Sequence, residues 1–319
     1  MRYALLALWV ATGCAGLPED AAGRQAEAPP SEEVAVVLSD ACEGATCHHL
    51  QVSCEGLPAR SLVVREFSGD GTRGTVVLTT GVFGIQRYDA DPVRRSTIGA
   101  LVEAGFQVFQ IEWGGGRTGW ITGAEGAGFS RALCGYAAVF RWILDQPARN
   151  PSVACAQGNS GGALQNGYGL ALYGLERELD LVVFSGGPPV TRIEQFCFGK
   201  PRDSGAKESG RRFVERALGW DRAICQPGAL GHEVLERARA DSLVSDGADR
   251  DVEYPATAVH FVLSEGDRSR IEARRFFDAI ESAKEWHWLP GNTHGIDATL
   301  EGASLIRDLF LEGCKSPRS

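Results

Sequence analysis

The sequence predicts an α/β protein: a mostly parallel sheet of about eight strands with helices on both faces. Strand-like runs alternate with helical patterns along most of the chain, which is typical of a parallel sheet. The run Val153–Ala156 is apolar throughout, as expected for a strand buried on both faces. The 319 residues, 44% hydrophobic and 23% charged, have the composition of a globular protein with a full core.

The N-terminus predicts an export signal in residues 1–13. It has one positive charge, a short apolar core and small residues before Cys14. This ending resembles a bacterial lipoprotein signal, which implies a lipid on Cys14 and a place in the cell envelope. Ala11 occupies the position three residues before Cys14, where lipoprotein signals usually have leucine. Secretion without a lipid, after cleavage of the signal at another site, therefore remains an alternative. Residues 14–33 are rich in Ala, Pro, Glu and Gly and predict a flexible tether.

The core is expected in residues 34–187 and 256–319, with its strands bounded by turn residues. The expected strands cover 50–55, 61–67, 75–80, 106–113, 152–157, 181–184, 259–263 and 286–289. The expected helices cover 92–104, 129–145, 268–283 and 297–311. The first two strands are joined by a turn around Gly56, so they look antiparallel and are expected at one edge of the sheet.

The alternation stops between Pro188 and Pro255. This stretch is charged and punctuated by glycine and proline, with short helical patterns at 211–218 and 232–240. A connection of this length inside an α/β domain is usually functional. The sequence therefore predicts a helical cap insertion, residues 188–255, over the site.

Eight cysteines follow Cys14, and an even number in an exported chain favours disulfides. They are Cys42, Cys47, Cys54, Cys134, Cys155, Cys197, Cys225 and Cys314. We expect Cys197 to pair with Cys225 within the cap, and one pair among the first three. The alternative for Cys134 and Cys155, which lie in an apolar helix and strand, is that they are buried thiols.

A candidate nucleophile, Ser160, lies between the strand 152–157 and a following helical pattern, within Gly158-Asn159-Ser160-Gly161-Gly162. A serine on a tight strand-to-helix bend needs neighbours almost without side chains, as Gly158 and Gly162 are. The backbone N–H of Gly161 can then donate to a developing oxyanion. Glycine contributes 40 of the 319 residues, so a glycine-rich turn with a bystander serine is the alternative.

A serine hydroxyl needs a base, and the base needs an orienting acid. Asp267 follows the strand 259–263, and His294 follows the strand 286–289. Residues beyond the carboxyl ends of parallel strands share one crevice, so Ser160, Asp267 and His294 are expected to converge. Asp297 and Glu265 are the alternatives for the acid.

The other five histidines occupy less suitable places. Two precede the first expected strand, two lie in strands and one lies in a cap helix: His48, His49, His260, His287 and His232.

The order Ser160, Asp267, His294, the strand–turn–helix and the glycine-containing loop Thr80–Gly84 together resemble the α/β-hydrolase superfamily over roughly residues 60–315. The resemblance implies an exported serine esterase that cleaves carboxylic esters through these three residues, with the backbone N–H of Val82 as the second oxyanion donor. A serine peptidase or amidase, and a catalytically silent ligand-binding lipoprotein, remain alternatives.

Composition also limits the partners. A net charge of −9 argues against a nucleic-acid partner, and we expect membrane contact only through a lipid on Cys14. The expected partner is a small-molecule or lipid-like ester. Gly114–Gly119 fits a dinucleotide fingerprint, but more loop follows where a helix should open, so no cofactor is expected. No metal site is expected either, since Cys47 and His48 lack identifiable further ligands.

Overall fold

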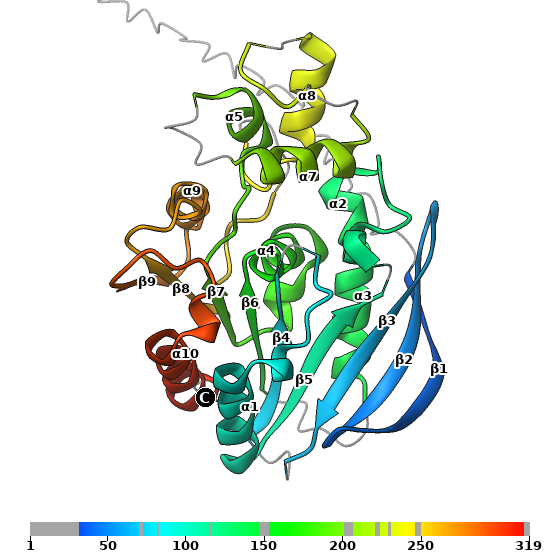
Figure 1. Cartoon of the computed structure of the whole chain (residues 1–319), viewed down its shortest axis with the longest axis vertical. Helices are drawn as coiled ribbons and strands as arrows, with labels where there is room; N and C mark the ends of the chain where they lie inside the picture. The colour runs from blue at the N-terminus through cyan, green and yellow to red at the C-terminus, as the bar shows by residue number, and fades with distance from the viewer. Residues whose placement is uncertain are drawn as a thin grey trace, which may run out of the picture.

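The structure of the chain is a computed structural model that describes residues 32–69, 73–81, 83–114, 116–146, 153–200, 207–220, 224–228, 231–245 and 250–315. It contains one nine-stranded sheet with helices on both faces (Figure 1). The strands are β1 (Glu32–Cys42), β2 (Ala45–Cys54), β3 (Leu57–Phe67), β4 (Gly74–Thr79), β5 (Phe106–Trp113), β6 (Ala154–Asn159), β7 (Leu181–Ser185), β8 (Ala258–Ser264) and β9 (Lys284–Leu289). The helices are α1 (Pro92–Glu103), α2 (Gly128–Ala132), α3 (Cys134–Leu144), α4 (Gly161–Tyr173), α5 (Ile193–Phe198), α7 (Glu208–Leu218), α8 (His232–Asp241), α9 (Arg270–Ala279) and α10 (Leu300–Gly313).

The sheet has the order β1-β2-β3-β5-β4-β6-β7-β8-β9. From β5 to β9 all neighbours are parallel, whereas β1, β2 and β3 pair antiparallel at one edge, as predicted for the opening strands. There is one strand more than the eight predicted. The extra strand, β1, is the exposed edge strand and begins at Glu32, two residues before the expected start of the core.

Each face of the sheet has its own hydrophobic cluster, because side chains alternate between the faces along each strand. On one face the strands pack against α3, α4 and α9. On the other face they pack against α1 and α10 through residues such as Ile98, Ile306 and Phe310. The adjacent strands β4, β6 and β7 are fully buried, so β6 is packed against neighbours on both sides and on both faces.

The predicted helix 129–145 is wrong in one respect: it is two helices, α2 and α3, separated at Leu133. The buried Arg60 guanidinium donates a 2.8 Å hydrogen bond to the carbonyl oxygen of Ala132, the last residue of α2. When a side chain donates a hydrogen bond to a backbone carbonyl oxygen of a helix, it interrupts the regular series of backbone hydrogen bonds. Arg60 lies 72 residues earlier in the chain, so no local pattern announces this break.

All eight cysteines of the described residues form disulfides. The predicted bond Cys197–Cys225 is present, and Cys42–Cys47 is the predicted pair among the first three cysteines. The alternative that Cys134 and Cys155 are buried thiols is wrong, because Cys134 is bonded to Cys54 and Cys155 to Cys314. The bonded cysteines are 80 and 159 residues apart in sequence, so nothing local indicates either pair.

The segment between β7 and β8 carries α5, α7 and α8, which lie together beyond one end of the sheet, at the top of Figure 1. Two buried carboxylates join this segment to the core. Asp241, at the end of α8, accepts hydrogen bonds from the backbone N–H groups of Phe129 and Ser130 at the start of α2. Glu272 of α9 accepts hydrogen bonds from the backbone of Thr191 before α5.

Cys14, the expected export signal and the tether up to residue 31 lie outside the described residues. Among the helices that the structure does describe, none combines the length and apolar character needed to cross a membrane.

Candidate active site

Ser160 lies on a sharp bend between β6 and α4. Its φ of 54° and ψ of −110° are strained for a residue with a side chain. A Cβ on Gly158 would lie 2.2 Å from the carbonyl carbon of Gly162, and one on Gly162 would lie 2.5 Å from Thr79 Oγ1. The bend therefore requires both flanking glycines, as the sequence predicted, and it places the serine hydroxyl beyond the carboxyl end of β6.

The structure brings Ser160, His294 and Asp267 together. His294 Nε2 lies 2.8 Å from Ser160 Oγ, and His294 Nδ1 lies 2.9 Å from Asp267 Oδ2. Ser160 and Asp267 are buried, whereas the His294 side chain is 44% exposed. The hydroxyl, the imidazole and the carboxylate thus form one continuous hydrogen-bonded chain that opens to solvent at the imidazole.

Asp267 is held in its ionised form. Burial by itself would raise the pKa of this carboxyl, but hydrogen bonds from His294 and Ser269 outweigh burial and place the pKa below its usual range. The Ser269 backbone N–H donates to Asp267 Oδ1 at 3.0 Å. An ionised carboxylate accepts a hydrogen bond from the His294 Nδ1–H and so keeps that proton on Nδ1, which leaves Nε2 free to accept the serine proton.

The two alternatives for the acid make other contacts. Asp297 is fully buried and pairs with Arg94 of α1, whose Nη2 lies 2.7 Å from Asp297 Oδ1. Burial raises the pKa of Asp297, although the Arg94 guanidinium opposes the shift. Glu265 is exposed. Asp267 is therefore the carboxylate in contact with His294.

Exchanging each aspartate for asparagine separates the two roles. We expect Asp267→Asn to lower kcat for p-nitrophenyl acetate about 10⁴-fold, because the amide favours the wrong imidazole tautomer. Asp297→Asn is expected to keep kcat within a few-fold but to lower the free energy of unfolding by about 3 kcal/mol, because Arg94 stays buried without its counter-charge. Initial rates and urea unfolding curves measure the two effects. A 10⁴-fold loss of kcat in Asp297→Asn would contradict this assignment.

Three further side chains position the candidate site and were not predicted. Asn159 Nδ2 donates to the carbonyl oxygen of His294 at 3.2 Å, and Ser264 Oγ donates to the carbonyl oxygen of Thr293 at 2.8 Å. Ser269 Oγ lies 2.6 Å from Asp267 Oδ2. Asn159 and Ser264 are the last residues of β6 and β8, and Ser269 lies in the segment that follows β8. Their position at the ends of strands that lead to Ser160 and Asp267 is the one sequence signal that could have indicated them.

Gly161 is the first residue of α4, so its backbone N–H has no partner within the helix. The second expected donor, Val82, lies outside the described residues. Its neighbour Phe83 is held in place by the glycine-rich loop: the Trp120 N–H donates to the Phe83 carbonyl oxygen, and a Cβ on Gly119 would lie 1.6 Å from that oxygen. Because Gly119 has no side chain, the backbone of its loop can lie directly against the loop after β4.

A cavity of about 270 Å³ adjoins Ser160, Gly161 and His294. Its other walls are mainly apolar and come from the loop after β4, from the start of the segment between β7 and β8, and from α5 and α7: Phe83, Pro189, Val190, Phe196 and Phe213. The cavity can therefore hold an apolar group directly beside the serine hydroxyl.

Comparisons with known proteins agree on the fold. Acetyl xylan esterase 1 from a Thermoanaerobacterium species superposes with a TM-score of 0.58 at 14% identity, covering 89% of this chain and 88% of that one. A putative hydrolase from Agrobacterium vitis superposes with a TM-score of 0.57 at 14% identity, covering 86% of this chain and 100% of that one. The acylaminoacyl peptidase of Pyrococcus horikoshii superposes with a TM-score of 0.54 at 9% identity, covering 89% of this chain and 50% of that one. No protein-family model and no curated protein sequence matches.

The chain has the α/β-hydrolase fold, as its sequence resemblance implied. An esterase and a peptidase share this architecture, so the fold by itself does not select the bond that is cleaved.

Proposed function

We propose that the protein is a serine hydrolase that cleaves carboxylic esters by two-step acyl transfer, with Ser160 as nucleophile, His294 as general base and acid, and Asp267 as the orienting acid. The observation that carries the proposal is the hydrogen-bonded chain from Ser160 Oγ through His294 to Asp267, with contacts of 2.8 and 2.9 Å. A serine hydroxyl becomes nucleophilic when a base in this position accepts its proton.

In the first step, His294 Nε2 takes the Ser160 proton while Oγ attacks the ester carbonyl carbon. The Asp267 carboxylate stabilises the imidazolium that results. The developing oxyanion accepts a hydrogen bond from the Gly161 N–H, for which the positive end of the α4 dipole adds favourable potential, and from the N–H of Val82. The imidazolium then protonates the leaving alcohol. In the second step, water attacks the acyl-enzyme with His294 again as base, and Ser160 regains its proton.

A fluorophosphonate probe tests the proposal against a silent binding protein. We expect one covalent adduct per chain, located on Ser160 by peptide mass spectrometry, because the probe reacts with activated serines. Absence of labelling in folded protein would exclude the enzyme. A paired panel of p-nitrophenyl esters and the matching p-nitroanilides then separates esterase from amidase or peptidase action, and we expect the esters to be cleaved much faster.

The apolar cavity leads us to propose that short acyl groups are preferred, since about 270 Å³ is at the small end of ligand pockets. Phe83→Ala is expected to raise the ratio of kcat/KM for p-nitrophenyl octanoate over acetate about tenfold, because a removed ring leaves room to bury more methylenes. Phe198→Ala, a partly buried phenylalanine that packs on Trp220, is the control and should leave the ratio unchanged. Equal ratios in all three proteins would contradict this acyl site.

We also propose that residues 188–255 act as a cap over this cavity and that a lipid on Cys14 anchors the protein to the cell envelope. The four disulfides are compatible with an oxidising compartment. Mass spectrometry of the mature N-terminus tests the anchor. A lipid-sized mass increment on Cys14 is expected, and an unmodified N-terminus elsewhere would indicate secretion without a lipid.

A further inference from the structure

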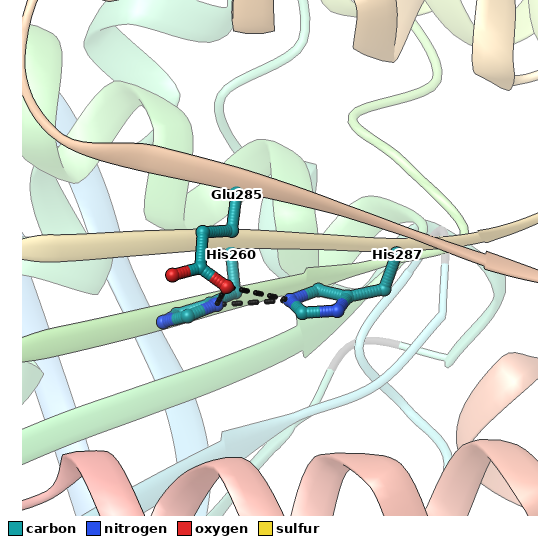
Figure 2. A group of neighbouring side chains, drawn as sticks. All are labelled: His260, Glu285 and His287. Atoms are coloured by element: carbon teal, nitrogen blue, oxygen red, sulfur yellow. Dashed lines mark hydrogen bonds and ion pairs between the residues drawn. The ribbon is translucent and has the colours of Figure 1, made fainter.

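Three potential metal-ligating side chains meet on the last two strands of the sheet (Figure 2). His260 lies on β8, and Glu285 and His287 lie on β9. In the parallel register His260 pairs with Glu285, and Val262 pairs with His287. Since alternate residues share a face, all three side chains project from the face of the sheet that α10 covers, where Val262 packs against Ile306 and Phe310.

The three nearest atoms form a small triangle. His260 Nδ1 lies 3.0 Å from His287 Nε2, and Glu285 Oε2 lies 3.7 Å from each of these nitrogens. A tetrahedral cation with bonds of about 2.0–2.2 Å separates its ligand atoms by about 3.3–3.6 Å. The observed separations lie on both sides of this range, so shifts of a few tenths of an ångström would place all three atoms in a coordination shell.

Hydrogen bonding within the cluster explains one side of the triangle only. Two neutral imidazoles can share one proton across 3.0 Å, with one nitrogen as donor and the other as acceptor. A separation of 3.7 Å is too long for a hydrogen bond, so the carboxylate contacts the rings only as an ion pair, which requires a protonated imidazole. Its oxygen instead faces the point between the two ring nitrogens, as Figure 2 shows.

The donor set selects the class of ion. Two imidazole nitrogens and one carboxylate oxygen suit Zn²⁺ and similar transition metals, whereas Mg²⁺ and Ca²⁺ prefer oxygen ligands alone. The two rings are largely buried, with side chains 12% and 22% exposed, but Glu285 is 68% exposed. The cluster is therefore fixed on its imidazole side and open on its carboxylate side, where an ion can enter and a water molecule can complete four-coordination.

We propose that His260, Glu285 and His287 form a binding site for a zinc-class divalent cation, distinct from the Ser160 site, that clamps the edge strand β9 to β8. None of the three lines the cavity beside Ser160. The two histidine ligands lie on β8 and β9, the strands that lead to Asp267 and His294, so the ion would stabilise the pairing of the two strands from which these loops start. The proposal does not depend on the hydrolytic function.

Calorimetric titration of chelator-treated, purified protein with zinc sulfate tests the site. We expect one ion per chain with a micromolar dissociation constant. At a free zinc concentration 100 times that constant, the thermal unfolding midpoint should rise by about 4 °C. Cobalt(II) should occupy the same site and develop visible absorption bands of tetrahedral coordination.

Variants locate the ion. His287→Gln should weaken zinc binding at least 100-fold and remove the cobalt bands, and Glu285→Gln should weaken binding about tenfold. Glu285 is exposed, so its variant tests the site even if substitution of a ring disturbs folding. Two controls should bind zinc as wild type does: His232→Gln, an exposed histidine elsewhere, and His294→Gln. No zinc binding at millimolar concentration, or binding lost in either control but kept in His287→Gln and Glu285→Gln, would overturn the proposal.

Discussion

Ser160→Ala is expected to lower kcat for p-nitrophenyl ester hydrolysis about 10⁶-fold, the loss seen when the nucleophile of a serine triad is removed. The methyl group of the alanine cannot form the acyl-enzyme, so the residual rate would come from the oxyanion donors and from substrate binding. The KM should change little, because the substituted atom contacts the carbonyl group chiefly during the reaction. Steady-state kinetics on acetate and butyrate esters measure both constants.

The matched control is Ser209→Ala, which removes the hydroxyl of an exposed serine lining the same cavity. Its kcat should stay within a few-fold of wild type. The folded state of Ser160→Ala is checked by its thermal unfolding midpoint, which should not fall because the strained bend keeps both of its glycines. A Ser160→Ala protein that is folded and retains a tenth or more of the wild-type kcat would refute the proposed nucleophile.

Removing the disulfide Cys155–Cys314 is expected to give the largest loss of stability of any single disulfide. It joins β6 to the residue that follows α10 and closes a loop of 159 residues. Loop-closure entropy predicts a loss of about 5 kcal/mol for this bond and about 2 kcal/mol for Cys42–Cys47, which spans 5 residues. The double variants Cys155→Ala/Cys314→Ala and Cys42→Ala/Cys47→Ala should thus differ by about 3 kcal/mol in the free energy of unfolding.

Urea unfolding of the oxidised proteins at equilibrium measures this difference, with refolding curves as the check on reversibility. Unfolding in the presence and absence of a thiol reductant measures the contribution of all four disulfides together. Equal losses in the two double variants would mean that loop length does not govern the contribution of these bonds, and that strain or residual structure in the unfolded chain does.

The parallel part of the sheet could be predicted because its strands are short apolar runs bounded by glycine, proline and polar residues. The strand Phe106–Trp113 was predicted with the bounds it has in the structure. The edge strand β1 was missed although Val34–Leu38 is an apolar, β-branched run. Most of that strand is exposed, so its burial pattern does not alternate in the way that identifies a half-buried strand.

Cysteine pairing shows a second limit. The sequence supports the presence of disulfides, but eight cysteines allow 105 pairings. Only the local bond Cys197–Cys225 and the pair within the first three cysteines could be inferred from proximity along the chain. Cys54 meets Cys134, and Cys155 meets Cys314, through crossovers that the sheet order determines.

The sequence by itself determined the alternating architecture and the order of Ser160, Asp267 and His294 after three different strands, because apolar periodicity and glycine spacing are local properties of the chain. Tertiary structure alone decided which carboxylate meets the imidazole, which residues hold the loops, and that His260, Glu285 and His287 meet across β8 and β9. Such contacts depend on strand order and register, which follow from the packing of the whole sheet and leave no local mark in the sequence.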